Sequence, residues 1–366
     1  MRFTIKLSLI KCNFTLLFQR TERREKMGLF SFLNKEIAID LGTANTLIIY
    51  KDQVVVDEPS IVAIDKKTNQ VIAVGKKAMM MHEKTHANIE TIRPLKDGVI
   101  ADFTAAEAMI RGFISMINDG NRWFRPSLTM VICIPSGITE VEKRAVVESA
   151  ERANARERYL IHEPMAAALG IGLDVEMPEG HMVIDIGGGT TEIAVIALSG
   201  IVTDQSIRIA GDEFTLDIVE YVKRQHNILI GERTAEQVKI HVGSALQDLE
   251  VPPDDFAVHG RDLLTGIPKQ VTVSYTEIAG CLDKSISKIE EAVMKALEST
   301  PPELASDIYR KGLYLTGGGA LLRGLDKRIA MKTKLPVRVA DDPLRAVVRG
   351  TGIALKNRDR YTFLMS

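Results

Sequence analysis

The 366-residue sequence has few cysteines, few aromatic residues and almost no net charge. Its three cysteines, Cys12, Cys133 and Cys281, are far apart, which argues against a cysteine-ligated metal cluster and suits a reducing compartment. Aromatic residues make up only 5%, and the formal net charge of -1 gives no general attraction to nucleic acid. No stretch after Met27 approaches the roughly 20 apolar residues of a membrane span. We therefore predict no nucleic-acid partner.

The length predicts two domains, or two lobes of one domain. Residues 1–26 differ from the rest, because an apolar stretch broken by Lys6 and Lys11 is followed by the charged run Gln19–Lys26. No clear signal-peptide pattern is present in them. We interpret residues 1–26 as an N-terminal extension, from an upstream translation start or a disordered segment, with a targeting segment as the alternative.

Two segments share one design: an apolar run, an aspartate, a glycine turn, a threonine and a second apolar run. They are Glu36–Tyr50 and His181–Leu198, and each is followed by another β-rich stretch, Gln53–Ile64 or Gly200–Ile209. This self-similarity indicates an internal duplication. Two such halves facing each other would place their hairpins across a shared cleft.

Strand-like and helix-like patterns alternate along the rest of the chain, which predicts α/β lobes with central mixed sheets. The predicted strands are Leu128–Pro135, Tyr159–His162 and Leu313–Ala320, the last running into a glycine turn. The predicted helices are Glu140–Ala153, Pro164–Gly170, Phe214–Gln225, Ala235–Leu246, Glu277–Leu297 and Arg345–Leu355. Pro252-Pro253 and Pro301-Pro302 predict loops.

The glycine hairpins are suited to a phosphate chain, because backbone N–H groups in a tight turn supply many donors where glycine lets the backbone approach. One hairpin alone is more often a simple turn, but two matching copies favour an ATP site. The predicted phosphate-binding residues are Gly42, Thr43, Ala44, Asn45 and Thr46 in the first hairpin, and Gly187, Gly188, Gly189 and Thr190 in the second, with Thr191 as a further hydroxyl donor.

Asp40 and Asp185 precede the two turns and would repel phosphate by themselves. Across a divalent cation they become useful, because Mg²⁺ keeps several waters and is often held through carboxylates and phosphate oxygens. We predict that both aspartates hold Mg²⁺ through its water shell.

Glu163 stands before Pro164, and proline at a first helical position predicts a helix start there. The positive end of the helix dipole would favour the ionised carboxylate. Our hypothesis is that Glu163 polarises the attacking water with the Thr190 hydroxyl as its partner. The alternative is a plain helix-capping carboxylate.

A third glycine turn, Gly317, Gly318, Gly319 and Ala320, offers a backbone face to a flat purine. The helix-like segment Glu232–Lys239 contributes Arg233, Thr234, Ala235, Glu236 and Lys239, of which Glu236 and Lys239 are placed to meet the ribose and base. A solvated helix face explains Glu236 and Lys239 equally well.

Two apolar features predict contact with a membrane surface. Leu29, Phe30, Phe32 and Leu33 follow Met27 with little polar relief, and Trp123 and Phe124 stand between Arg122 and Arg125. An aromatic pair flanked by cations suits an anionic lipid surface. Packing of the pair into the nearby lobe is the alternative.

In order along the chain, these motifs resemble the actin, heat-shock chaperone and sugar-kinase ATPase superfamily, and within it the MreB branch of bacterial actins. The motifs that carry the resemblance are IDLGTANTLIIY from Ile39, IRPLKDGVIADF from Ile92, IHEPMAAALG from Ile161, VIDIGGGTTEIAV from Val183, AGDEFT from Ala210, LYLTGGGALLRGL from Leu313 and DDPLRAVVRGTGIAL from Asp341. The resemblance covers Met27 to about Leu355.

The resemblance implies an actin-like ATPase fold with two ribonuclease H-like lobes divided into four subdomains. Lobe I would comprise residues 27–174, with subdomain IB inserted at about 65–107, and lobe II residues 175–340, with subdomain IIB inserted at about 215–282. Residues 341–366 would return to lobe I.

The resemblance also implies slow ATP hydrolysis by Glu163 and Thr190, and filaments, formed by paired protofilaments, on the inner face of the cytoplasmic membrane. Partners would be further copies of the chain, the membrane and the cell-wall elongation machinery, and the role would be maintenance of rod shape. Relatives usually carry Glu-Glu-Pro where this chain has His162-Glu163-Pro164.

Two other function classes remain as alternatives. A monomeric chaperone ATPase would need a peptide-binding domain after the nucleotide lobes, and the chain ends about a dozen residues after its last motif. A sugar or acetate kinase would need a base for the acceptor hydroxyl, and no aspartate is assigned to that role.

Overall fold

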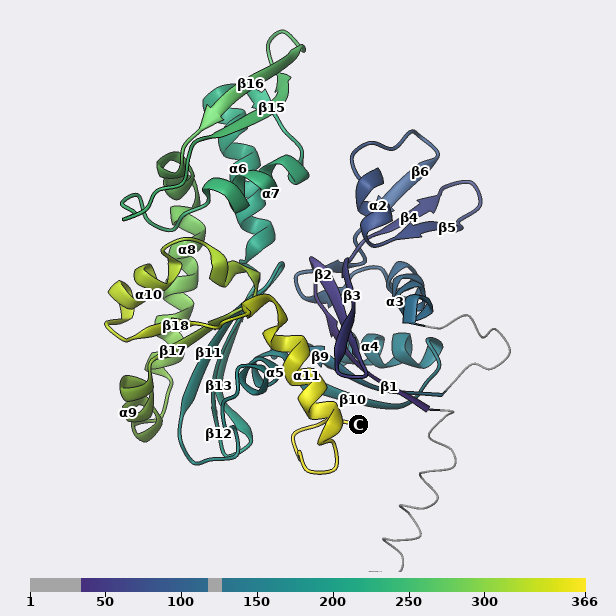
Figure 1. The fold of residues 1–366 in the computed structure, drawn as a ribbon, viewed down its shortest axis with the longest axis vertical. Coiled ribbons are helices and arrows are strands. Elements are labelled where there is room, and N and C mark those ends of the chain that lie inside the picture. Colours follow the sequence, from purple (N-terminus) through teal and green to yellow (C-terminus); the bar gives the residue numbers. More distant parts are fainter. Residues whose placement is uncertain (1–33, 118–126) are drawn as a thin grey trace, which may run out of the picture.

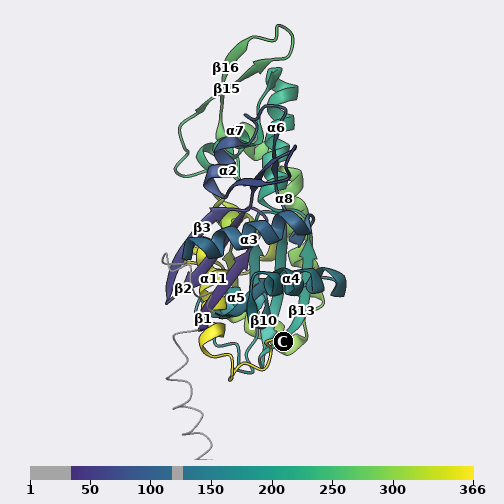
Figure 2. The ribbon, with the colours of Figure 1, turned by 90° about the vertical axis from the view of Figure 1, so that its right-hand side faces the viewer.

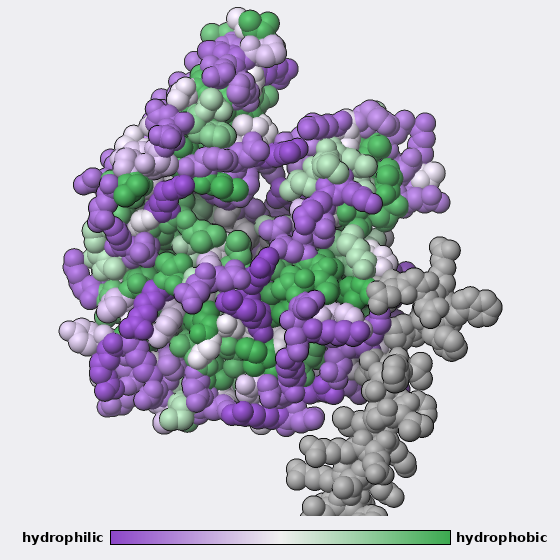
Figure 3. All heavy atoms as spheres, viewed as in Figure 1, coloured by the Kyte–Doolittle hydropathy of each residue, from purple (hydrophilic) through white to green (hydrophobic). Residues whose placement is uncertain are grey.

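The computed structural model describes residues 34–117 and 127–366, which form two lobes that lie side by side in Figure 1 and overlap in the turned view of Figure 2. Each lobe is built on a five-stranded sheet and carries a smaller sheet at its upper end in Figure 1. On the face drawn in Figure 3, the surface is hollowed between the upper parts of the lobes. The predicted division into two α/β lobes is therefore confirmed.

Lobe I has the sheet order β10-β9-β1-β2-β3. Its strands are β1 (Asn34–Leu41), β2 (Asn45–Tyr50), β3 (Gln53–Pro59), β9 (Ser127–Ile134) and β10 (Ala155–His162), and its helices are α3 (Phe103–Ile117), α4 (Glu140–Arg152) and α5 (Glu163–Gly170). Between β3 and α3 the chain forms β4 (Val62–Asp65), β5 (Val71–Val74), α2 (Lys76–Met81), β6 (Ile89–Ile92), β7 (Leu95–Lys96) and β8 (Val99–Ile100). Of these, β4, β5 and β6 make the small sheet.

Lobe II has the sheet order β13-β12-β11-β17-β18. Its strands are β11 (His181–Ile186), β12 (Thr191–Ala197), β13 (Gly200–Ile207), β17 (Leu313–Thr316) and β18 (Val337–Val339), and its small sheet comprises β14 (Ile228–Leu229), β15 (Phe256–Asp262) and β16 (Pro268–Val273). Its helices are α6 (Gly211–His226), α7 (Glu232–Val242), α8 (Tyr275–Glu298), α9 (Pro302–Lys311), η2 (Gly318–Leu321) and α10 (Leu325–Thr333), followed by η3 (Pro343–Arg345) and α11 (Ala346–Lys356).

The two large sheets have the same topology, as an internal duplication requires. In lobe I, β1 is antiparallel to β2 and parallel to β9, and β10 continues the parallel side. In lobe II, β11 is antiparallel to β12 and parallel to β17, and β18 continues the parallel side. The hairpins that suggested the duplication therefore occupy equivalent places in two copies of one sheet.

Local sequence signals account for several helix boundaries. Capping boxes begin α4, with Thr139 and Glu142, and α8, with Ser274 and Glu277. The predicted apolar face of α8 is buried in the core of lobe II through Ile278, Leu282, Ile286, Ile289 and Val293. These buried side chains pack α8 against strands β12 and β13 of the lobe II sheet.

Some predicted elements were displaced or wrong. The α7 helix starts at Glu232 and ends at Val242, instead of running over Ala235–Leu246, because Gly243 ends it. Pro302 begins α9 rather than extending a loop, since proline is compatible with a first helical turn. The small sheets span Val62–Ile92 and Ile228–Val273. The subdomain boundaries expected from the resemblance, at about 65–107 and 215–282, remain a proposal.

Helices α5 and α11 lie together between the two large sheets. A Cβ built on Gly350 would stand 1.7 Å from the carbonyl oxygen of Ala166, and one on Gly170 would stand 1.8 Å from that of Ala346. Only glycine permits this approach. The C-terminal helix also packs on β1 and β9, and Met365 pairs with Leu160 of β10, so the chain returns to lobe I after crossing lobe II.

This contact predicts a position-specific cost on α11. Gly350→Ala should destabilise the protein by about 3 kcal/mol, because the added methyl would clash with the backbone of α5 at Ala166, and a helix backbone cannot shift as a flexible side chain can. Gly352→Ala is the matched control, since its Cβ would meet only the Ile49 side chain, at 3.2 Å, and should cost less than about 1 kcal/mol. Urea unfolding measures both, and equal costs would contradict the proposed packing.

Candidate functional site

The two glycine hairpins meet where the lobes meet. A Cβ built on Gly188 would stand 2.7 Å from the Cβ of Ala44, and one on Gly189 would stand 2.7 Å from Thr43 Oγ1. The turn after β1 and the turn after β11 therefore approach each other backbone to backbone. The structure brings the two predicted cradles together.

The Asp97-Gly98 turn between β7 and β8 also contacts both hairpins. The Gly98 N–H donates to Thr43 Oγ1 at 2.9 Å, and a Cβ on Gly98 would stand 2.9 Å from Thr190 Cγ2. Gly98 also has a φ of +79°, which favours glycine. Sequence reasoning used this stretch only as a mark of resemblance and did not place it at the site.

Several predicted phosphate donors are occupied within the protein. The buried Thr46 hydroxyl is 2.9 Å from Ser60 Oγ, which donates to Gly42 O, and Thr191 Oγ1 donates to Ile209 O. The Gly187 N–H is used inside its own turn, where it donates to Thr190 O. The hydroxyls of Thr46 and Thr191, two residues that we expected to bind phosphate, therefore brace the hairpins in this structure. Asn45, by contrast, is exposed.

The turns are flanked by four acidic side chains. Asp40 and Asp185 lie near the ends of β1 and β11, Glu163 begins α5, and Glu192 lies on β12. Asp185, Glu163 and Glu192 are buried and Asp40 is partly buried. Among these, Glu192 was missed, although it is the only charged residue in the apolar strand Thr191–Ala197, which is the signal that would have found it.

Burial governs the protonation of the aspartates. It raises the pKa of Asp40 to about 6, against a hydrogen bond from Cys133 Sγ at 3.1 Å that lowers it. It raises the pKa of Asp185 to about 7, opposed by the Thr316 hydroxyl at 2.7 Å and reinforced by the charges of Asp40 and Glu192. No lysine or arginine is among these influences. Cys133 and Thr316 were not predicted as site residues.

Glu163 differs from the prediction in two ways. The helix α5 begins at Glu163, so Pro164 is its second residue and His162 is the N-cap. Burial, followed by the charges of Glu192, Asp40 and Asp185, raises the pKa of Glu163 well above its usual range. The expected preference for the ionised form was wrong, because desolvation and three carboxylates outweigh the helix dipole.

The carboxylates fit a cation that is held through water. Within residues 34–117 and 127–366, no three His, Cys, Asp or Glu side chains are arranged to hold a metal directly. A hydrated Mg²⁺, bound also by phosphate oxygens, needs only one or two protein carboxylates. Asp40 and Asp185 could serve it from opposite lobes.

The predicted ribose and base residues form a compact network on lobe II. Lys239 Nζ donates to Gly211 O at 2.7 Å and to Thr215 Oγ1 at 3.0 Å, and it pairs with Glu236 at 2.6 Å. The same end of α6 binds the second hairpin, because the Gly211 N–H donates to Gly187 O at 3.1 Å. The network therefore borders the second glycine hairpin.

The other predicted base-binding residues are placed unequally. Arg233 is exposed on the first turn of α7 and Thr234 is half-buried, whereas Ala235 and Ala320 are buried in the core of lobe II. The side chains of Ala235 and Ala320 are thus unavailable to a ligand. Gly317, Gly318 and Gly319 follow β17, where a Cβ on Gly317 would stand 2.3 Å from Ile186 O. This third glycine turn therefore lies against the end of β11.

The lobes also touch above the hairpins. The Glu232 N–H at the start of α7 donates to Glu83 Oε1 at 3.0 Å, and Arg93 pairs with Glu232 at 3.3 Å. Glu83 and Arg93 belong to lobe I and Glu232 to lobe II.

The predicted membrane residues Leu29, Phe30, Phe32, Leu33, Trp123 and Phe124 lie outside the described residues.

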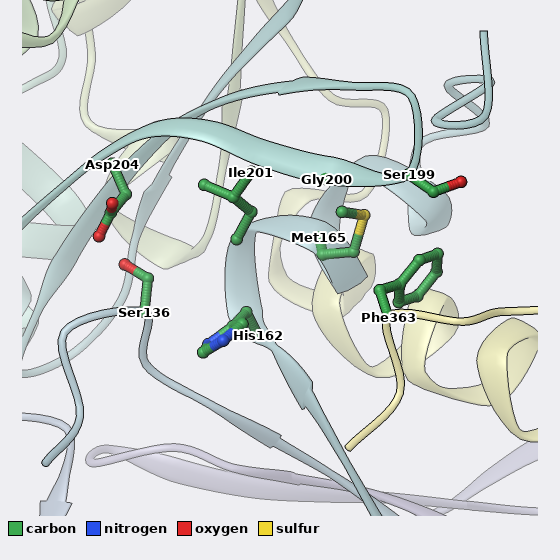
Figure 4. A pocket seen from close by; sticks show the side chains of 8 residues that line it. All are labelled: Ser136, His162, Met165, Ser199, Gly200, Ile201, Asp204 and Phe363. Atoms are coloured by element: carbon green, nitrogen blue, oxygen red, sulfur yellow. The ribbon is translucent and has the colours of Figure 1, made fainter. Parts of the chain in front are cut away.

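A cavity of about 280 Å³ lies between the lobes near the start of α5 (Figure 4). Its lining residues are Ser136, His162, Met165, Ser199, Gly200, Ile201, Asp204 and Phe363. Figure 4 shows Ser136, His162 and Asp204 gathered at one end and Phe363 at the other. Neither Asp40, Asp185 nor a residue of the two glycine hairpins lines this cavity.

Comparison with known proteins fits this geometry. The family described as MreB/Mbl protein matches residues 34–362. The chain belongs to the MreB/Mbl family. It is 50% identical over 339 residues to the cell shape-determining protein MreB of Escherichia coli (strain K12), which covers 91% of this chain and 96% of that protein.

Two further relatives agree with this assignment. The cell shape-determining protein Mbl of Bacillus subtilis (strain 168) is 47% identical over 327 residues, covering 89% of this chain and 97% of that protein. The crystal structure of MreB 5 of Spiroplasma citri bound to AMPPNP superimposes with a TM-score of 0.84 at 41% identity, covering 89% of this chain and 97% of that one. The fold is actin-like, and the family is that of cell shape-determining proteins.

The raised pKa values predict a pH dependence of stability in the absence of metal and nucleotide. Because the native state keeps protons on Asp40 and Asp185 that the unfolded state releases at lower pH, the free energy of unfolding should fall as the pH rises from about 4 to about 7. We expect a loss on the order of a few kcal/mol by pH 8, measured by urea unfolding with a chelator. Asp185→Asn should make the free energy of unfolding depend less on pH, whereas Asp359→Asn, at an exposed position, should leave the dependence unchanged. If the parent and both variants show the same pH dependence, the buried Asp185 is not its source.

Proposed function

We propose that the chain binds and slowly hydrolyses ATP with Mg²⁺, and that it polymerises into filaments which maintain rod shape. The observation that carries the proposal is the meeting of two equivalent glycine hairpins, each with its aspartate, beside the buried Glu163. The Spiroplasma relative bound to AMPPNP supports an adenine nucleotide as the ligand.

The residues present divide the chemistry between them. Backbone groups of the two hairpins would hold the phosphate chain, and Asp40 and Asp185 would hold Mg²⁺ through its water shell. Mg²⁺, when bound, supplies charge neutralisation of the phosphates. Glu163 accepts a hydrogen bond from the attacking water, with the Thr190 hydroxyl as its partner. Burial and the neighbouring carboxylates raise the pKa of Glu163, so the charge of a bound cation would favour its ionised, hydrogen-bond-accepting form.

Glu163→Ala tests the assignment of the water-polarising group. We expect hydrolysis to fall by about 100-fold, while ATP affinity changes little because Glu163 is not a phosphate donor. Glu157→Ala, an exposed glutamate on the adjoining strand β10, is the matched control and should hydrolyse at the parental rate. Phosphate release and nucleotide titration measure the two quantities, and parental hydrolysis by Glu163→Ala would refute the role.

Filament formation and cell location belong to the same proposal. We infer that copies of the chain assemble as paired protofilaments on the inner face of the cytoplasmic membrane, where they organise the cell-wall elongation machinery. Among the described residues, no helix is long and apolar enough to cross a bilayer. We assign membrane contact to the segment Leu29–Leu33 and to the Trp123-Phe124 pair. A sugar-kinase activity would instead yield a phosphorylated product without ATP-dependent polymer.

Electron microscopy with ATP on anionic vesicles tests the lipid contact. The double variant Trp123→Ala/Phe124→Ala should lose most of its vesicle-bound polymer and still sediment as polymer with ATP, because the pair contributes membrane contact rather than assembly. Lipid binding equal to that of the parent would exclude the Trp123-Phe124 pair as the anchor. Absence of sedimentable polymer from the parent would contradict filament formation.

A further inference from the structure

Glu192 is a buried carboxylate whose hydrogen bonds cross from one lobe to the other. On its Oε2 atom it accepts from the Ser136 N–H at 3.1 Å and from Ser136 Oγ at 2.5 Å. On Oε1 it accepts from Ser206 Oγ at 2.6 Å. Ser136 follows β9 of lobe I, whereas Ser206 lies on β13 directly opposite Glu192 in lobe II. Two of the three bonds therefore join the lobes, and the third stays inside one.

The segment that Glu192 holds is connected to the rest of the site. In the β9 end (Cys133–Ser136), Cys133 Sγ donates to Asp40 Oδ1 at 3.1 Å. His162 Nδ1, on the residue that precedes Glu163, lies 3.4 Å from Pro135 O. If this segment moved, it would therefore change the position of Asp40 and of His162, which precedes α5.

Close packing accompanies the hydrogen bonds. A Cβ built on Gly137 would stand 3.1 Å from the Cβ of Ser206, and one on Gly98 would stand 3.0 Å from Pro135 Cγ. The β9 end and the adjoining Gly137 therefore pack closely against Ser206 of lobe II on one side and the Asp97-Gly98 turn on the other. Glu192 accepts three hydrogen bonds at a buried position, and leaving their donors unpaired would be costly, so this contact can hold a preferred arrangement of the lobes.

We propose that Glu192 is a positioning residue, which ties the β9 end to lobe II and thereby sets Asp40 and Glu163 relative to the second phosphate hairpin. The role rests on the proposed ATP hydrolysis, which Glu192 would serve without touching the nucleotide. It makes hydrolysis depend on closure of the lobes, because the two Ser136 bonds exist only when lobe I and lobe II are together.

Ser136→Ala and Ser206→Ala form the decisive pair. Each removes one hydroxyl that donates to the same carboxylate at nearly the same distance, but only Ser136→Ala removes a bond between the lobes. Ser206 is exposed, so water can replace its hydroxyl. We expect Ser136→Ala to lower kcat about tenfold with ATP affinity within about twofold of the parent, and Ser206→Ala to change both by less than about twofold.

Hydrogen exchange gives a readout that does not need hydrolysis. In nucleotide-bound protein, amides of residues 131–139 should exchange about tenfold faster in Ser136→Ala and at the parental rate in Ser206→Ala. Glu192→Ala should show the same acceleration. Glu192→Gln should be close to the parent, because its amide oxygen can accept from Ser136 while its NH2 group donates to Ser206.

The outcomes separate the two proposals. If the parent does not hydrolyse ATP, the proposed function fails, and the exchange rates alone decide whether Glu192 joins the lobes. If the parent hydrolyses ATP but Ser136→Ala and Ser206→Ala behave alike in kcat and in exchange, the positioning role is overturned. Acceleration by Glu192→Gln equal to that by Glu192→Ala would also overturn it, since Gln retains the bonds.

Discussion

Burial of several carboxylates at one junction is the constraint on which the rest of the structure depends. Asp40, Asp185, Glu163 and Glu192 come from both lobes, and the influences on the pKa values of the two aspartates include no basic side chain. Such a group of acids is unfavourable when ionised in a desolvated site. A cation that arrives with the nucleotide would relieve this repulsion. Ligand binding and lobe closure would then stabilise each other.

The contacts between the lobes are arranged at three levels around this junction. Ser136 and Glu192 meet on one side, the hairpins meet at Ala44 and Gly188, and Glu83 meets the start of α7 above them. Helices α5 and α11, held together by glycines, provide the packed connection about which the lobes are joined. A ligand bound by both hairpins would add a further contact between the lobes to those on either side of it. A junction of this kind is suited to the conformational switching that the proposed filament would require.

Much of the fold was readable from the sequence because the signals were local or repeated. The repeated hairpin design predicted two equivalent sheets, and the apolar spacing of Glu277–Leu297 predicted α8 closely. The aspartates, glycines and Glu163 could be proposed as site residues from the sequence because their motifs are short and contiguous. The protonation of Glu163 was predicted wrongly, since its local helix position favours charge while burial, and then three carboxylates distant in sequence, raise its pKa. Ser136, Cys133 and Gly98 were missed for a similar reason: only the tertiary fold brings them to the hairpins.

Calorimetric titration of the protein with Mg·ATP at about pH 6.5, in two buffers with different heats of ionisation, tests the role of the buried acids most directly. Because the pKa values of Asp40 and Asp185 are raised to about 6 and about 7 before binding, a cation between them should lower both and release protons to the buffer. We predict a heat that depends on the buffer, with proton release reduced in Asp185→Asn. A binding heat that is the same in both buffers would contradict the coupling between these carboxylates and the bound cation.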